Sequence, residues 1–147
     1  MTHILAAVDF SEVSEQVLAN AEKLARAQGA RLTLLHVAAP APEFVGYETG
    51  PQSVRDGRAK SLREEHSTLQ QQAARLRERG LDAHALVVEG PNVETILREA
   101  RRLASTTIVL GSHGHGALYD ALVGSVSAGV IRGSTCPVLI VPAGGRV

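Results

Sequence analysis

The chain has 147 residues, 44% of them hydrophobic, and its 15 basic and 15 acidic side chains give a formal net charge of zero. That length suits a single domain with a sizeable core. Because there is no basic excess and only 3% of the residues are aromatic, we expect binding neither to nucleic acid nor to an acidic membrane surface. No apolar run approaches the ~20 residues of a membrane span and no signal peptide is evident, so we expect no membrane insertion and a cytoplasmic location. Cys136 is the only cysteine, which fits a reducing compartment, and its apolar neighbours predict a buried structural thiol.

The first part of the chain alternates between strand-like and helix-like patterns. Residues 3–8 form a short apolar run that ends at Asp9 and predicts a strand. Ser11 is placed to cap the helix that follows, and Gly29 to end it. Residues 31–37 then predict a second buried strand. The expected apolar face of the helix comprises Val13, Val17, Leu18, Ala21, Leu24 and Ala25.

The middle of the chain opens with a segment that has no periodicity. Residues 38 to about 57 carry three prolines and three glycines, which predicts a long, mobile loop. Residues 58–79 predict a highly charged helix in which Glu64, Glu65 and Glu78 alternate with arginines, and we interpret this surface as a solvated face with intrahelical ion pairs. The expected apolar stripe of that helix is Leu62, Leu69, Ala73 and Leu76.

The remaining elements complete a regular alternation. The pattern predicts strands over 82–88, 106–110 and 137–141 and helices over 93–104 and 125–131. Near-continuous apolar strands joined by helices predict an α/β fold with an open, doubly wound, five-stranded parallel sheet covered on both faces, spanning residues 1–147 as one domain. Ligands of such sheets bind beyond the carboxyl ends of the strands, where the strand order reverses.

A glycine pattern follows the penultimate strand. It reads Gly111-Ser-His-Gly114, nine further residues, then Gly124-Ser125 and a helix. Glycines let a backbone approach a ligand closely, and free N–H groups at a helix N-terminus suit phosphate oxygens. Because the chain has neither a Gly-Lys-Ser/Thr sequence nor a G-x-G-x-x-G sequence after the first strand, a mononucleotide is favoured over a dinucleotide.

This pattern is similar to that of the universal stress protein family, in its ATP-binding branch. The resemblance covers the whole chain, from Ala7-Val8-Asp9 and Leu34-Leu-His-Val37 to the closing Cys136-Pro-Val-Leu-Ile-Val-Pro142. It implies an adenine nucleotide alpha hydrolase-like domain with sheet order 3-2-1-4-5. It also implies ATP or another adenine nucleotide as ligand, a homodimer paired through the last strand, and a regulatory partner protein that the sequence does not identify.

The resemblance also implies a set of site residues. Ala7, Val8 and Asp9 match the segment lining the adenosine pocket, and Val37 matches a contact to adenine. Gly111, His113, Gly114 and His115 match the loop around ribose and phosphates, whereas Gly124, Ser125, Val126 and Ser127 match the turn that holds the phosphate tail. The backbone N–H groups of residues 124–127 and the hydroxyls of Ser125 and Ser127 are the expected phosphate donors.

Two positions depart from the family's common pattern. Phe10 stands where the family often has glycine, which could narrow the first turn, and Asn92 stands where proline is common, a change we expect to be remote from the phosphates. The glycine motif itself contains no lysine or arginine. Phosphate charge would therefore be offset by backbone donors, the helix dipole and a divalent cation such as Mg²⁺ or Mn²⁺.

Several residues permit two interpretations. Asp9 is either a nucleotide contact or a helix-entry residue that accepts backbone hydrogen bonds near Ser11. His113 and His115 are phosphate or ribose contacts, solvated loop residues or metal ligands, and without a cysteine or carboxylate cluster they make a poor zinc pair. His36, inside an apolar strand, is expected to be a hydrogen-bonded structural residue.

The favoured function is a nucleotide-dependent regulatory protein of the stress response. The alternative is a slow ATPase or phosphotransfer enzyme that uses the same site. Efficient phosphoryl transfer needs positioned cations and a residue that orients the nucleophile, and the motif supplies neither, so we expect slow ATP hydrolysis at most and assign no catalytic residue.

Overall fold

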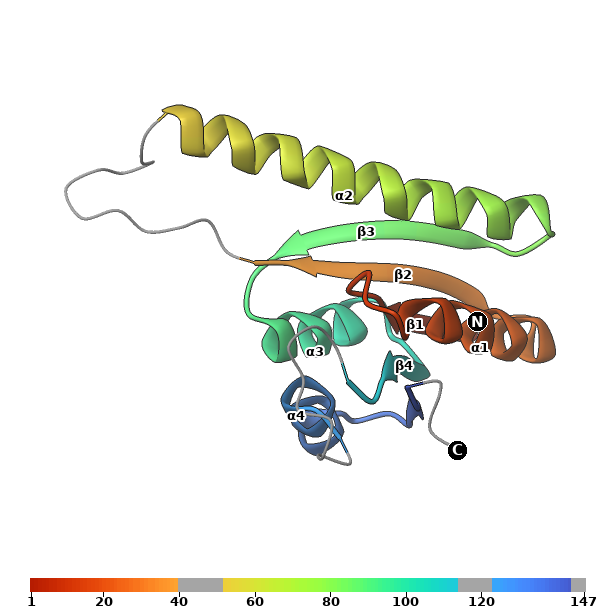
Figure 1. The fold of residues 1–147 in the computed structure, drawn as a ribbon. Coiled ribbons are helices and arrows are strands. Elements are labelled where there is room, and N and C mark those ends of the chain that lie inside the picture. Colours follow the sequence, from red (N-terminus) through yellow and green to blue (C-terminus); the bar gives the residue numbers. More distant parts are fainter. Residues whose placement is uncertain (40–51, 114–122, 144–147) are drawn as a thin grey trace.

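The computed structural model describes residues 1–39, 52–113 and 123–143, and of residues 52–54 the backbone alone. Nine elements alternate along these ranges (Figure 1). They are β1 (His3–Ala7), α1 (Ser14–Gln28), β2 (Arg31–Ala38), α2 (Gln52–Glu78), β3 (Ala83–Glu89), α3 (Asn92–Arg102), β4 (Thr107–Gly111), α4 (Ser125–Gly133) and β5 (Val138–Val141).

The five strands form one parallel sheet in the order β3-β2-β1-β4-β5, which confirms the expected topology. From β1 the chain first adds β2 and β3 on one side, then crosses to add β4 and β5 on the other. Right-handed crossovers therefore place α1 and α2 on one face and α3 and α4 on the opposite face. The strand order reverses between β1 and β4, so the expected ligand crevice lies beyond the carboxyl ends of these two strands.

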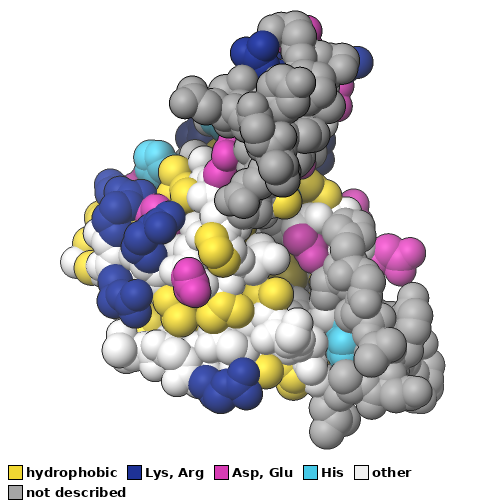
Figure 2. All heavy atoms as spheres, turned by 90° about the vertical axis from the view of Figure 1, so that its left-hand side faces the viewer, with side chains coloured by type: hydrophobic (Ala, Val, Ile, Leu, Met, Phe, Trp, Pro, Cys, Tyr) yellow, Lys and Arg dark blue, Asp and Glu magenta, His cyan; other side chains and the backbone are white. Residues whose placement is uncertain are grey.

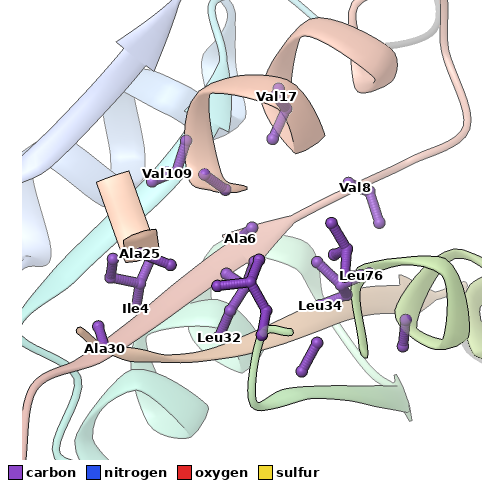
Figure 3. Close-up of a cluster of buried hydrophobic side chains, with 14 of the residues drawn as sticks. Ile4, Ala6, Val8, Val17, Ala25, Ala30, Leu32, Leu34, Leu76 and Val109 are labelled. Atoms are coloured by element: carbon purple, nitrogen blue, oxygen red, sulfur yellow. The ribbon is translucent and has the colours of Figure 1, made fainter. Parts of the chain in front are cut away.

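Two apolar cores, one on each face, hold the helices to the sheet. On the α1 and α2 face, the buried Ile4, Leu32 and Leu34 of the sheet pack with Val17 and Leu76 (Figure 3). On the other face, alternate strand residues such as Leu5 and Ile108 pack with Ile96 and Val130. Because successive strand residues point to opposite faces, a sheet with helices on both sides needs apolar residues at nearly every position. This explains the continuous apolar runs of the sequence.

The ends of α3 and α4 differ from the sequence prediction by two residues, and the starts of α1 and α2 differ in ways that have a physical reason. The helix α1 begins at Ser14 rather than after Ser11, whose side chain does not cap it. The helix α2 begins at Gln52, so residues 52–57 of the predicted loop are helical and Ala38 belongs to β2, whereas residues 40–51 lie outside the described ranges. The sequence predicted a later start for α2 because Gly57, which lies in the helix interior, is a residue of low helix propensity.

Most residues of the two expected apolar faces are buried. Val13, Val17, Ala21 and Ala25 are buried, as are Leu69, Ala73 and Leu76 of α2, whereas Leu18, Leu24 and Leu62 are half-buried. Cys136 is half-buried rather than buried, because it precedes β5 at the edge of the sheet. Among the described residues, none of the helices combines the length and the apolar character that a membrane crossing needs.

Candidate functional site

A cavity of about 810 Å³ lies at the carboxyl ends of β1, β2 and β4, where the strand order reverses. Cavities that bind small molecules commonly measure roughly 300–1,000 Å³. Figure 2 views the molecule from this side, where hydrophobic and acidic side chains lie beside residues that are not described. The residues that line the cavity and carry the argument below are Val8, Asp9, Phe10, His36, Val37, Glu65, Asn92, Gly111, His113, Gly124, Ser125, Val126 and Ser127.

One wall of the cavity is built around His36 of β2. Its ring nitrogen Nδ1 lies 2.8 Å from the carbonyl oxygen of Val8, and since a carbonyl only accepts, Nδ1 carries a proton. Its Nε2 lies 3.3 Å from Oε2 of Glu65 on α2, an ion pair when the ring carries both protons. His36 is thus the hydrogen-bonded structural residue we expected, and it links β1, β2 and α2.

Phe10 completes this wall in a strained backbone conformation. Its φ of +61° lies in the left-handed region, which costs a residue with a side chain roughly 1–2 kcal/mol. Glycine, the residue that the resemblance led us to expect here, would adopt this φ without strain. The Phe10 ring lies on His36, with 4.6 Å between the ring centroids and 35° between the planes.

Asp9 organises the turn between β1 and α1. Its Oδ1 accepts the backbone N–H of Ser11 at 3.0 Å and the hydroxyl of Ser14 at 3.2 Å. This is the helix-entry role, and it replaces the cap expected from Ser11. Asp9 also lines the cavity, so a nucleotide contact stays a prediction.

The opposite side of the cavity is the start of α4. Its N-cap residue Gly124 is extended, with φ −68° and ψ 166°, and no side chain caps this end in the described chain. The first N–H groups of a helix have no intrahelical acceptor. Those of Ser125, Val126 and Ser127 are therefore suited to an anion at this place, which a helix dipole also favours.

Two of the expected phosphate donors are engaged elsewhere. The Gly124 N–H donates to the carbonyl of Ser112 at 2.6 Å, and the Ser127 hydroxyl donates to the carbonyl of Gly111 at 2.6 Å. Ser127 is 3% exposed and its single hydroxyl proton is used in this bond. In this structure these two groups therefore donate within the chain, and their donation to phosphate stays a prediction. Both fix the start of α4 to the end of β4.

Ser112, which the sequence did not single out, joins three segments. Its N–H donates to the carbonyl of Val141 at 2.8 Å, and its carbonyl accepts the N–H of Gly124. Its hydroxyl accepts the N–H of Ala143 at 3.2 Å and lies 3.0 Å from Nδ1 of His113. The buried Ser112 thus holds β4, β5 and α4 in one arrangement around the cavity, a role that no local pattern indicates.

The structure gathers most of the predicted site residues. Those that line this cavity together are Ala7, Val8, Asp9, Val37, Gly111, His113, Gly124, Ser125, Val126 and Ser127. Gly114 and His115 lie outside the described residues.

Two lining residues were misjudged from the sequence. Glu65 was assigned to a solvated helix face, but α2 crosses the end of β2 and turns this carboxylate toward His36. Asn92 was expected to be remote from the phosphates, but α3 begins there and Asn92 lines the same cavity as the start of α4. No local sequence pattern marks either residue as part of the site, because both reach the cavity through the packing of helices from distant parts of the chain.

The charges around the cavity are acidic and neutral. None of the described lining residues is lysine or arginine, whereas Asp9 and Glu65 are carboxylic. The described residues contain no group of three or more His, Cys, Asp or Glu side chains placed to hold a metal ion.

The comparisons with known proteins agree with this architecture. The model of the universal stress protein family matches residues 1–142, and the chain belongs to this family. Universal stress protein YxiE of Bacillus subtilis is 34% identical over 143 residues, covering 94% of this chain and 97% of YxiE.

Solved structures share the fold. The hypothetical protein MJ0577 superposes with a TM-score of 0.84 at 26% identity, covering 99% of this chain and 98% of MJ0577. A universal stress protein in complex with cAMP superposes with a TM-score of 0.68, covering 97% of each chain, and at 24% identity this likeness shows the fold alone.

Proposed function

We propose that the chain binds an adenine nucleotide, ATP in the first place, in the cavity at the carboxyl ends of β1, β2 and β4, and acts as a nucleotide-dependent regulatory protein of the stress response. The observation that carries the proposal is the uncapped start of α4, with three N–H groups free of intrahelical acceptors, on one side of an 810 Å³ cavity. A solved protein of the same fold is in complex with cAMP, which supports an adenine nucleotide as the ligand.

The cavity has a side for each part of such a ligand. Val8, Phe10 and Val37 offer an apolar surface to a base, and Asp9 offers oxygens to ribose hydroxyls. Ser125, Val126 and Ser127 offer backbone N–H groups, and Ser125 also a hydroxyl, to the phosphates. Because the described lining residues include no basic side chain, Mg²⁺ or Mn²⁺ bound to the phosphates would offset their charge.

Titration calorimetry of the purified chain with ATP, AMP and cAMP, with and without Mg²⁺, tests the proposal. We expect binding of one ATP per chain, strengthened by Mg²⁺ and abolished in Gly124→Val, because a Cβ at this position would meet the Ser112 carbonyl oxygen at 3.2 Å and a larger side chain would fill the space beside the free N–H groups. Gly57→Val is the matched control, since a Cβ there meets no atom within 4 Å. Wild-type protein that binds none of the three nucleotides would overturn the proposal.

The same preparation separates a regulatory protein from a slow ATPase. We expect the ATP that is bound at the start to be recovered intact after hours with Mg²⁺ or Mn²⁺, since no described residue of the cavity resembles the cationic groups of phosphoryl-transfer sites. Steady ADP release, lost in Gly124→Val, would instead establish the enzyme.

We also propose a cytoplasmic homodimer formed through β5. This strand is at one edge of the sheet and exposes Leu139 by 39%. An unpaired strand edge is a ready surface for a second strand. Light scattering should give twice the mass of one chain for the wild type and one mass for Leu139→Lys.

A further inference from the structure

We propose that Phe10 is the residue that holds the base of the nucleotide, through stacking of the base on the aromatic wall formed by Phe10 and His36. This deepens the proposed nucleotide-binding function and rests on it. Phe10 is the only phenylalanine, tyrosine or tryptophan among the described residues, and it lines the cavity.

The first argument is the backbone at Phe10. A bulky side chain at φ +61° is a rare outlier, and glycine would adopt this conformation without strain. Such strain concentrates where a side chain serves a site. The ring is half-buried, so its own packing gains less than that of a fully buried ring.

The second argument is the fixed position of the ring. The ring of Phe10 lies on His36 at 4.6 Å. His36 is held in turn by the Val8 carbonyl at Nδ1, and Oε2 of Glu65 lies 3.3 Å from its Nε2. A ring backed by an immobilised imidazole offers a base a preorganised surface, and base–aromatic stacking accepts any base with a flat π-face.

The third argument is the position of this wall relative to α4. Phe10 follows β1, and His36 belongs to β2. The groups proposed to bind phosphate follow β4, on the other side of the reversal in strand order. A nucleotide with its phosphates at α4 would extend its base toward β1 and β2. Phe10 itself carries no polar group, so its contribution to a base is stacking, whereas the buried Oε2 of Glu65 beside it has no hydrogen-bond partner among the described residues.

Binding of ATP and of inorganic tripolyphosphate, measured on three proteins, tests the proposal. We expect Phe10→Leu to lower ATP affinity about tenfold and Phe10→Gly about thirtyfold, in the range of one stacking contact. Both variants should bind tripolyphosphate as the wild type does. The melting temperature of Phe10→Gly should stay within about 4 °C of wild type, since relief of backbone strain offsets lost packing.

The outcomes are distinct. Unchanged ATP affinity in both variants, with a wild type that binds ATP, overturns the role of Phe10 and leaves the nucleotide-binding proposal intact. Equal losses for ATP and tripolyphosphate also overturn it, because they would mean that the turn, and not the base surface, was altered. A wild type that binds neither ligand overturns the proposed function itself.

Discussion

The hydroxyl of Ser127 donates to the carbonyl of Gly111 over 2.6 Å, joining the first turn of α4 to the last residue of β4. Ser127 is 3% exposed, and the bond is partly buried beside the cavity that both residues line. The geometry of the cavity on the α4 side therefore depends on this hydrogen bond. From the sequence alone, the Ser127 hydroxyl was expected to bind phosphate together with the hydroxyl of Ser125.

Ser127→Ala should destabilise the protein by about 1–2 kcal/mol, because the partly buried Gly111 carbonyl loses the hydroxyl as a donor. Ser125→Ala, at an exposed position, should change the free energy of unfolding by less than about 0.5 kcal/mol and lower ATP affinity up to about tenfold. Urea unfolding and calorimetry on the two variants measure both effects. The reverse pattern, with Ser125→Ala the less stable variant, would contradict this division of roles.

Gly111→Ala should cost about 1–3 kcal/mol, because a Cβ there would lie 2.5 Å from Cγ1 of Val13. The cause can be isolated with Val13→Ala, which removes that methyl group. In the Val13→Ala background the added methyl of Gly111→Ala should cost less, giving a coupling energy above 0.5 kcal/mol in a double-mutant cycle of urea unfolding. Strictly additive costs would show that Val13 is not the obstacle.

Asp9→Asn and Asp9→Ala distinguish the two roles of Asp9. Asparagine keeps an oxygen that accepts from Ser11 and Ser14, so the free energy of unfolding of Asp9→Asn should stay within about 0.5 kcal/mol of wild type. That of Asp9→Ala should fall by about 1 kcal/mol. If Asp9 contacts the nucleotide, both variants should bind ATP several-fold more weakly. An ATP affinity that Asp9→Asn leaves unchanged would restrict Asp9 to the helix-entry role.

Protonation of His3 should weaken the fold in mildly acidic solution. Burial, and next the positive charge of Arg31, lower the pKa of His3 below its ordinary value of 6.5, and its Nε2 lies 2.7 Å from the Thr33 hydroxyl. The unfolded chain then binds more protons than the folded one between the lowered pKa and 6.5. The contribution of neutral His3 to the free energy of unfolding is complete above pH 6.5. It is lost as the pH falls through this window, at no more than about 1.4 kcal/mol per pH unit.

Urea unfolding of wild type and His3→Gln at pH 7.5, 6.5 and 5.5 measures this contribution. The variant should lose less stability than wild type between pH 6.5 and 5.5. The carboxyl of Asp82 does not confound the comparison, because the Arg31 and His84 hydrogen bonds hold its pKa below 3.8 and its titration falls at lower pH. Parallel pH profiles for the two proteins would remove His3 as the source.

The sequence by itself determined the order of the strands and helices and the place of the cavity. Continuous apolar runs are required by strands buried on both faces, and right-handed crossovers leave few ways to connect them. The glycines after β4 could likewise be recognised, because the backbone conformation and the close approach of a helix N-terminus are local properties of the chain.

Only the tertiary structure decided which polar groups are free to meet a ligand. The Ser127 hydroxyl and the Gly124 N–H have the right chemistry for phosphate, but Gly111 and Ser112 accept their protons. Glu65 and Asn92 reach the cavity because α2 and α3 pack across the ends of distant strands. A hydrogen-bond donor is used up by whichever acceptor the packing of the whole chain brings beside it, and that acceptor cannot be identified from local spacing.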